Sequence, residues 1–246
     1  MMSKSPRVGV VTFPGSNGDH DAFWAFHHVL GADTRLIDYR ATGIDGIDAI
    51  VIPGGFSYGD YLRCGAIARF APIMETIAEF AEHGGLVLGI CNGFQILTEA
   101  HLLPGALVRN QSLRFHAHWT NIIFEQSAQS WTRALSAGSP LRLPVAHGEG
   151  AYTIEAEGLE QLERHGQIVA RYCSEDGVTS DAANPNGSVA SIAGISNRRG
   201  NVVGLMPHPE RAVERLVGGD DGVQVLRAFL TATRFTLVGE SLVTSS

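Results

Sequence analysis

Short apolar runs alternate with amphipathic segments through the first half of the chain. The runs are rich in β-branched residues and predict buried strands, whereas the segments between them repeat apolar residues at helical spacing. The expected strands are Arg7–Thr12, Thr34–Asp38, Ala49–Ile52 and Leu86–Ile90, and the expected helices are Asp19–Leu30, Ile67–Glu82 and Phe94–Ala100, with Asp19 as a cap. This alternation predicts an α/β fold with an open, mostly parallel sheet flanked by helices.

The second half of the chain is less regular, and its strand order does not follow from the pattern. Strands are expected at Thr120–Phe124, Arg142–Ala146, Ile168–Tyr172, Val189–Ile195 and Val202–Leu205. The polar, turn-forming segment Ser174–Gly187 predicts a surface loop, and Gly222–Phe235 a last helix followed by a frayed tail. No linker or repeat divides the chain, so we expect one domain over residues 1–246 with an ordered core of about residues 7–235.

Composition narrows the class of protein. With 44% hydrophobic and 17% charged residues the chain belongs with globular proteins, and its net charge of -7 gives no reason to expect nucleic acid or an anionic membrane as partner. Lys4 is the only lysine, which argues against a phosphate-binding P-loop and against Schiff-base chemistry. The absence of a signal-like start and of a long apolar stretch predicts a cytoplasmic protein.

One of the three cysteines stands in a pattern typical of a nucleophile. Cys64, Cys91 and Cys173 show no CxxC spacing, so neither a disulfide framework nor a zinc site is indicated. Cys91, however, lies in Gly89-Ile-Cys-Asn-Gly93 between an apolar strand and a helix, where glycines permit a sharp turn. The helix N-terminus favours a thiolate, and the N–H of Asn92 can stabilise an oxyanion. The alternative for Cys91, a buried structural cysteine, is the interpretation kept for the other two.

A second oxyanion donor and a base are also needed. Pro53-Gly54-Gly55 follows a predicted strand at the same sheet edge, so a backbone N–H there, at Gly55, can approach a substrate; a tight structural turn is the alternative. Two His-x-Glu pairs can supply a base and the carboxylate that orients it: His147 with Glu149, and His208 with Glu210. Pro209 stiffens the second pair and Pro207 restrains the approach to it, which favours this pair without excluding the first.

Longer strings of the sequence resemble a known family. Cys91 with His208-Pro-Glu210 resembles the class I (triad) glutamine amidotransferases, whose flavodoxin-like fold agrees with the predicted sheet. Four strings, Pro53–Arg69, Gly89–Leu97, Pro144–Gly150 and Met206–Ala212, are similar to the glutaminase subunits of phosphoribosylformylglycinamidine synthases, and the similarity spans about Arg7 to Phe229. The resemblance decides the base in favour of His208 and Glu210.

The resemblance implies a function within purine biosynthesis. Glutamine is expected to be hydrolysed at Cys91, and the ammonia to pass to a large synthetase subunit that uses ATP and Mg; bacterial complexes of this kind also contain a small third subunit. No cofactor or metal is expected in this chain, and His116 and His118 lack a third ligand. Gln95, Asn110 and Ser112 match family segments that receive glutamine, with helix packing and an ordinary loop as the alternatives.

Three other functions remain open from the sequence. A different class I amidotransferase and a free-standing cysteine hydrolase would use the same turn at Cys91, and a non-catalytic subunit would merely support a synthetase. The intact set of Cys91, His208 and Glu210 argues against the last. His147 and Glu149 are expected near the mouth of the site or at a partner contact, without a chemical role.

Overall fold

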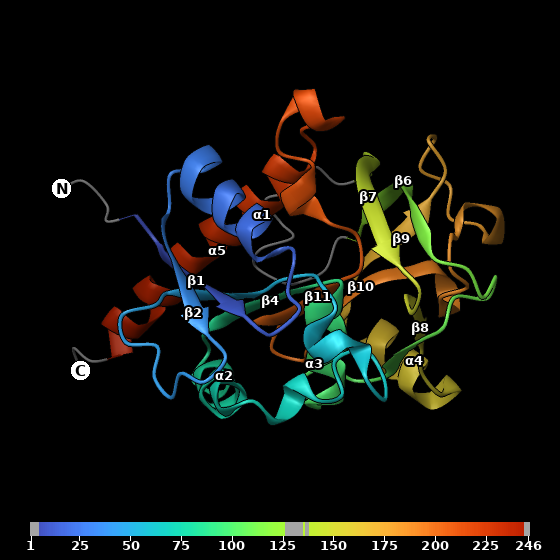
Figure 1. Cartoon of the computed structure of the whole chain (residues 1–246). Coiled ribbons are helices and arrows are strands. Elements are labelled where there is room, and N and C mark those ends of the chain that lie inside the picture. Colours follow the sequence, from blue (N-terminus) through green and yellow to red (C-terminus); the bar gives the residue numbers. More distant parts are fainter. Residues whose placement is uncertain (1–4, 126–134, 136–137, 244–246) are drawn as a thin grey trace.

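A mixed sheet forms the centre of the molecule. The computed structural model describes residues 5–125, 135 and 138–243, with only the backbone for 234–243. Within them, nine strands form one sheet in the order β2-β1-β3-β4-β11-β10-β9-β6-β7 (Figure 1). Their bounds are β1 Arg7–Thr12, β2 Asp33–Asp38, β3 Ala49–Ile52, β4 Leu86–Ile90, β6 His116–Phe124, β7 Leu141–His147, β9 Ile168–Cys173, β10 Ile192–Ser196 and β11 Val202–Leu205.

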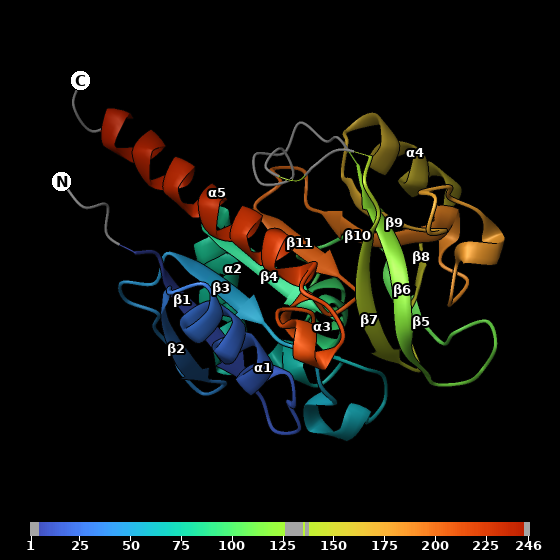
Figure 2. The same cartoon turned by 90° about the horizontal axis from the view of Figure 1, so that it is seen from above.

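The first five strands of this order are parallel and carry the predicted architecture. Every residue of β3, β4 and β11 is buried, as expected for strands covered on both faces. Helices α1 (Asp19–Trp24) and α5 (Gly222–Val243) lie on one face, and α2 (Pro72–Glu82) and α3 (Asn92–Glu99) on the other (Figures 1 and 2). The predicted open sheet with helices on both faces is confirmed, and the carboxyl ends of β3, β4 and β11 meet at one edge.

The remaining strands extend the sheet in antiparallel fashion. β10 pairs with both β11 and β9, and β6 pairs with both β9 and β7. The sequence pattern did not predict three short elements here: β5 (Ala106–Val108) and β8 (Ala151–Thr153), which pair with each other, and helix α4 (Ala156–Arg164). Their shortness explains the omission, because periodicity is weak over three to nine residues. Figure 2 shows α4 beside the antiparallel half.

Several predicted helix boundaries were wrong. The expected helix Asp19–Leu30 divides into α1 and a π-helical turn, Ala25–Val29, and Gly18 instead of Asp19 occupies the N-cap position. The helix expected from Ile67 begins only at Pro72, after a 3-10 turn, because proline has no N–H to bond the preceding turn and suits the first helical position.

Two further helix boundaries, the start of α3 and the end of α5, differ from the prediction. α3 begins at Asn92, directly after Cys91, instead of Phe94, so the cysteine itself is the N-cap residue. α5 continues to Val243 instead of ending at Phe235, since no proline interrupts that stretch and an isolated glycine is tolerated. The end of the predicted tail, residues 244–246, lies outside the described residues. Among the described helices none is long and apolar enough to span a bilayer.

Close packing between α3 and the sheet requires glycine at position 93. A Cβ on Gly93 would collide with the backbone carbonyl oxygen of Ile52 on β3, which cannot rotate away. Gly93→Ala is therefore expected to destabilise the protein by about 1–3 kcal/mol, although the same change in an exposed helix stabilises it by roughly 1 kcal/mol. Urea unfolding followed by circular dichroism measures the difference.

The matched control is Gly43→Ala. A Cβ at Gly43 meets nothing within 4 Å, so its free energy of unfolding should remain near that of the parent protein. Equal stability of the two variants would refute the packing argument for Gly93.

Candidate active site

Cys91 lies at a sharp turn between β4 and α3. Its N–H donates to the carbonyl oxygen of Leu205 at 2.8 Å, and its own carbonyl accepts the first helical bond from Gln95 at 3.1 Å. Between these two bonds the backbone of Cys91 adopts φ 50° and ψ -104°, a conformation that L-residues rarely occupy. The turn directs Cys91 to the sheet edge, where its side chain is only 4% exposed and the thiol lies 3.7 Å from the carbonyl oxygen of Ala146.

His208 and Glu210 follow β11, the parallel neighbour of β4. The Nδ1 of His208 lies 2.6 Å from Oε1 of Glu210, and both side chains are buried. The N–H of His208 also donates to the carbonyl oxygen of Pro144 at 2.9 Å, which fixes the backbone of the pair against β7. The sequence prediction of an oriented histidine at this strand end agrees with this geometry.

Gly54 shows that Cys91 and His208 are neighbours. A Cβ on Gly54 would stand 2.6 Å from Cε1 of His208 and 3.6 Å from the Cβ of Cys91. The two side chains therefore converge on the backbone of the Pro53–Gly55 turn. Nε2 of His208 is buried and has no hydrogen-bond partner of good geometry within the described residues, so it is free to exchange a proton there.

The charge state of His208 follows from its surroundings. Burial alone would lower the pKa of this imidazole, but the negative charge of Glu210, and then the charge and proximity of the Cys91 sulfur, outweigh it and raise the pKa to about 10. His208 is consequently an imidazolium over the neutral pH range when Cys91 is a thiolate. Arg211 adds a second cation, 3.8 Å from Glu210, and its guanidinium also holds Asp21 and Asn17.

Two backbone N–H groups are available beside the sulfur. Gly55 has φ 148°, and its N–H has no acceptor in the described chain, while its neighbours on both sides bond to the loop at residues 15–18. The N–H of Asn92 is the first of α3 and likewise has no acceptor among the described residues. The side chain of Asn92 accepts the N–H of Ser57 at 3.1 Å, so it ties the start of the helix to the segment that follows Gly55.

The second His-x-Glu pair is built differently. His147 is 3% exposed, and its Nδ1 lies 3.1 Å from Oδ1 of Asn110, a neutral partner. Glu149 does not contact the imidazole: its carboxylate lies 3.4 Å from the N–H of Cys64 and 3.9 Å from Arg109. The two pairs, equivalent in sequence spacing, therefore differ in structure, and only His208 is held by a carboxylate.

The residues predicted to receive glutamine have different environments. The amide of Gln95 is buried and donates to the carbonyl oxygen of Glu149 at 2.6 Å. Asn110 is fully buried, and its side chain and its backbone N–H both bond protein groups. Ser112 is exposed, and its hydroxyl lies 2.8 Å from Nε2 of His116.

A buried polar network behind the site was not predicted. Asn186 donates to the carbonyl oxygen of Gly150 and to the hydroxyl of Tyr172, and Ser188 bonds both Asn186 and Gly150. The segment Ser174–Gly187 is otherwise largely exposed, as expected of a surface loop, but Asn186 is only 1% exposed. A polar, turn-rich sequence gives no signal for one buried asparagine, so pattern reasoning could not have identified it.

The other two cysteines lack the features of Cys91. Cys173 ends β9 and is buried, and Cys64 lies in the loop before α2 beside Asp60 and Glu149. Burial and the two nearby carboxylates raise the pKa of the Cys64 thiol far above its usual range, which makes it a poor nucleophile. In the described part of the chain, no three His, Cys, Asp or Glu side chains are arranged to hold a metal ion.

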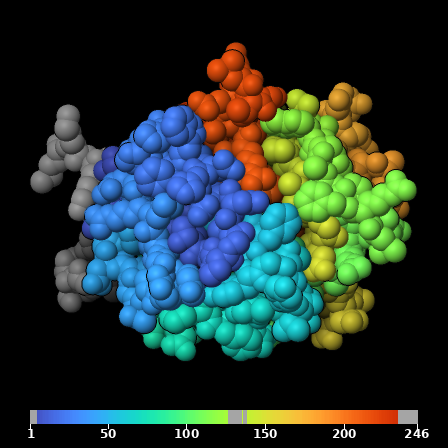
Figure 3. Space-filling model, in the orientation of Figure 1, coloured from blue at the N-terminus to red at the C-terminus, as the bar shows by residue number. Residues whose placement is uncertain are grey.

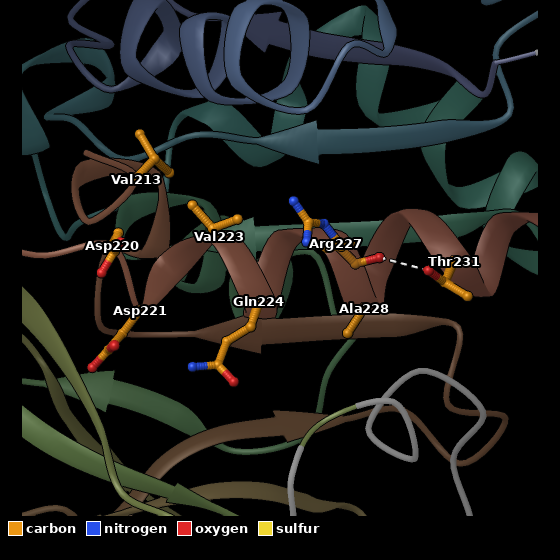
Figure 4. A pocket seen from close by; sticks show the side chains of 8 residues that line it. All are labelled: Val213, Asp220, Asp221, Val223, Gln224, Arg227, Ala228 and Thr231. Carbon is orange, nitrogen blue, oxygen red and sulfur yellow. Dashed lines mark hydrogen bonds between the residues drawn. The ribbon is translucent and has the colours of Figure 1, made fainter. Parts of the chain in front are cut away.

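A cavity of about 350 Å³ opens beside the site. Its lining residues are Phe56, Asp60, Cys64, Arg109, Leu113, Arg114, Phe115, Gly148 and Glu149. It thus begins next to Gly55 and to the strand end that carries His147, where Figure 3 shows cyan segments of the first half beside green and yellow segments of the second. A larger cavity of about 540 Å³ lies along α5, lined by residues such as Gln224 and Arg227, and no triad residue lines it (Figure 4).

Comparison with known proteins gives a consistent picture. The profile of the CobB/CobQ-like glutamine amidotransferase domain matches residues 5–219. The phosphoribosylformylglycinamidine synthase subunit PurQ of Thermomicrobium roseum is 60% identical over 225 residues, covering 92% of this chain and 95% of the relative. The PurQ subunit of Moorella thermoacetica is 54% identical, covering 91% of this chain and 95% of its own length.

Solved structures agree with these matches. A chain in the structure of PurLQS from Thermotoga maritima is 43% identical, with a TM-score of 0.81 over 93% of this chain and 99% of that one. A second glutamine amidotransferase from Thermotoga maritima, 15% identical with a TM-score of 0.54 over 96% of this chain and 97% of that one, shares the fold. The chain therefore belongs to the glutamine amidotransferase family and, within it, to the PurQ subunits of phosphoribosylformylglycinamidine synthase.

Proposed function

We propose that this chain hydrolyses glutamine at Cys91 and supplies the ammonia to phosphoribosylformylglycinamidine synthesis, with His208 and Glu210 completing the triad. The observation that carries the proposal is the convergence of Cys91 and a carboxylate-held His208 on Gly54, beside two available N–H groups. A nucleophile, a base oriented by a carboxylate and two oxyanion donors are the parts that acyl transfer requires.

The first half of the reaction forms a thioester. The Cys91 thiolate attacks the side-chain carbonyl carbon of glutamine, and the N–H groups of Gly55 and Asn92 stabilise the negative charge on its oxygen. The His208 imidazolium donates its proton to the amide nitrogen, the carbon–nitrogen bond breaks, and neutral ammonia leaves. The raised pKa of His208 supports this order, because the histidine enters the cycle already protonated.

The second half restores the enzyme. His208, now neutral, accepts a proton from water as the water oxygen attacks the thioester carbon, and the carbon–sulfur bond breaks to release glutamate and the Cys91 thiolate. Glu210 keeps Nδ1 of the imidazole protonated and stabilises its charge throughout. Gln95, Asn110 and Ser112 are proposed to contact glutamine.

The surface at the mouth of the site supports docking of a partner. Phe56, Leu113 and Phe115 line the cavity and are 44%, 78% and 53% exposed, and Tyr61 and Leu62 add further exposed apolar area in the same loop as Phe56. Exposed apolar groups gathered in this way are typical of protein interaction sites. We propose that a large synthetase subunit covers this mouth and receives the ammonia, as the PurLQS assembly of the Thermotoga relative suggests.

ATP and Mg belong to that partner in this proposal. The chain has neither a P-loop lysine nor a nucleotide-phosphate motif, so phosphate chemistry is assigned to the synthetase subunit, and a small third subunit completes the complex. We propose that the reaction takes place in the cytoplasm.

The proposal predicts the outcome of covalent labelling. A diazoketone analogue of glutamine should modify Cys91, excess glutamine should suppress the reaction, and Cys91→Ala should abolish both the labelling and glutaminase turnover in the assembled complex. Mass spectrometry of the intact chain and of its peptides locates the adduct.

Cys64→Ala and Cys173→Ala are the controls and should label like the parent chain. Labelling at either of these cysteines instead of Cys91, or turnover retained by Cys91→Ala, would contradict the mechanism. Labelling of Cys91 that glutamine does not suppress would point to a hydrolase with a different substrate.

The electrostatics of His208 predict a pH shift in Glu210→Gln. Because the charge of Glu210 is the largest influence that raises this pKa, its removal should lower the pKa, and the alkaline limb of kcat/KM should move to lower pH. A raised pKa also means that the pair stabilises the fold fully below pH 6.5, the ordinary value, and that this contribution disappears as the pH rises towards about 10. The variant should therefore lose stability at neutral pH and little at alkaline pH.

Glu214→Gln makes the same charge change at an exposed position of the same segment and should leave both profiles unchanged. The pH dependence of glutaminase activity and of the thermal midpoint tests this. An alkaline limb at the same pH in Glu210→Gln and the parent chain would contradict the assignment of Glu210.

A further inference from the structure

His147 is a buried histidine at the site for which the acyl-transfer mechanism has no use. Its side chain is 3% exposed at the end of β7, one residue after the carbonyl group of Ala146 that lies against the Cys91 thiol. His147 and His208 have the same sequence spacing, since each is followed two residues later by a glutamate. Its partners, however, identify a different role.

Asn110 determines the tautomer of His147. The amide nitrogen of Asn110 donates to the carbonyl oxygens of Arg114 and His147, at 2.8 and 2.9 Å, so the amide oxygen must be the atom that faces the ring. That oxygen lies 3.1 Å from Nδ1 of His147 and also accepts the N–H of Gly150 at 3.0 Å. Nδ1 therefore carries the proton and donates it to Asn110.

The ring is also uncharged. Burial lowers the pKa of His147 most, and the positive charge of His208, followed by those of His116 and His118, lowers it further, to about 3. The nearby carboxylate of Glu149 is directed to Cys64 and Arg109 instead of the imidazole. Because its partner is a neutral asparagine, His147 stays uncharged. His208 is therefore the protonated histidine of the site.

The bond between His147 and Asn110 closes a clamp on residues 146–150. Asn110 binds this segment at three points, the carbonyl oxygens of His147 and Gly148 and the N–H of Gly150. Within the segment, the carbonyl of Ala146 faces the sulfur of Cys91, and the carbonyl of Glu149 accepts the amide of Gln95 on the helix that follows Cys91. The clamp therefore sets where the strand end stands relative to the nucleophile.

We propose that His147 is a positioning residue, which acts through its Nδ1–H and Asn110 to hold the carbonyls of Ala146 and Glu149 against Cys91 and its helix. The inference rests on the proposed function of Cys91, but it assigns His147 no proton transfer. A displacement of about 1 Å in such a support is enough to cost on the order of a hundredfold in rate.

Two substitutions of His147 distinguish the roles of its two ring nitrogens. The amide N–H of asparagine can occupy the place of Nδ1–H, whereas the amide of glutamine reaches the place of Nε2. His147→Asn should therefore keep the clamp, and His147→Gln should break it. The measurement is the second-order rate of Cys91 modification by the diazoketone glutamine analogue on the full chain, followed by kcat and KM of the assembled complex.

We expect His147→Asn to react at a rate near that of the parent chain. His147→Gln should be slower by roughly tenfold to a hundredfold, the upper figure being the full misplacement penalty, with kcat affected more than KM. A merely structural role would not produce this rescue by the shorter amide. The reverse ranking would assign the role to Nε2 and overturn the proposal. Equal rates in all three chains, or equally slow variants that remain folded by circular dichroism, would overturn it as well.

Nitrogen-15 NMR of labelled histidine gives an independent test. His147 should show a protonated Nδ1 and a bare Nε2 across the neutral pH range, and a proton on Nε2 would overturn the assignment. If the analogue fails to modify Cys91 of the parent chain even with the synthetase subunit present, the proposed function fails, a result distinct from any ranking of the two variants.

Discussion

The parallel pairing of β4 with β11 is the constraint on which the site depends. Its register sets Ile90 opposite Leu205, and the bond from the Cys91 N–H to the Leu205 carbonyl continues the ladder one residue beyond. The nucleophile and the segment that carries His208 therefore leave the sheet side by side. A slip of one residue would reverse the faces of β11 and separate them. Because both strands are buried on both faces, such a slip would also disturb close packing on either side of the sheet.

The two histidines of the site, His147 and His208, show how a hydrogen-bond partner sets the charge of a buried imidazole. Both are buried at strand ends and both precede a glutamate by two residues, yet their pKa values are displaced in opposite directions. Burial opposes the charged form in each case. The carboxylate of Glu210 overcomes that cost for His208, while the amide of Asn110 satisfies Nδ1 of His147 without supplying charge. Proximity to the imidazolium of His208 then makes a second imidazolium still less favourable.

The first half of the fold could be predicted from sequence because local signals agreed there with the tertiary structure. The predicted strands β1, β3 and β4 have the observed bounds, and the turn at Cys91 follows from glycine spacing between an apolar strand and a helix. The order of β10, β9, β6 and β7 could not be predicted, since antiparallel neighbours are chosen by long-range packing that no periodicity records. Likewise, the spacing of His147 and Glu149 is that of a catalytic pair, and only the position of Asn110, far away in the chain, shows otherwise.

The strained backbone at Cys91 explains why the supports of the site come from so many segments. A φ of 50° with ψ of -104° costs a non-glycine residue about 1–3 kcal/mol, and the turn persists only if its surroundings allow no alternative. The N–H of Cys91 is fixed by its bond to the carbonyl of Leu205, and the carbonyl of Cys91 is fixed by the first helical bond, from the N–H of Gln95. Gly89 and Gly93 remove the Cβ atoms that would prevent α3 from returning against β4 and β3. Relaxing the turn would therefore require breaking the sheet or moving the helix, and the position of the sulfur at the sheet edge is retained by the stability of both.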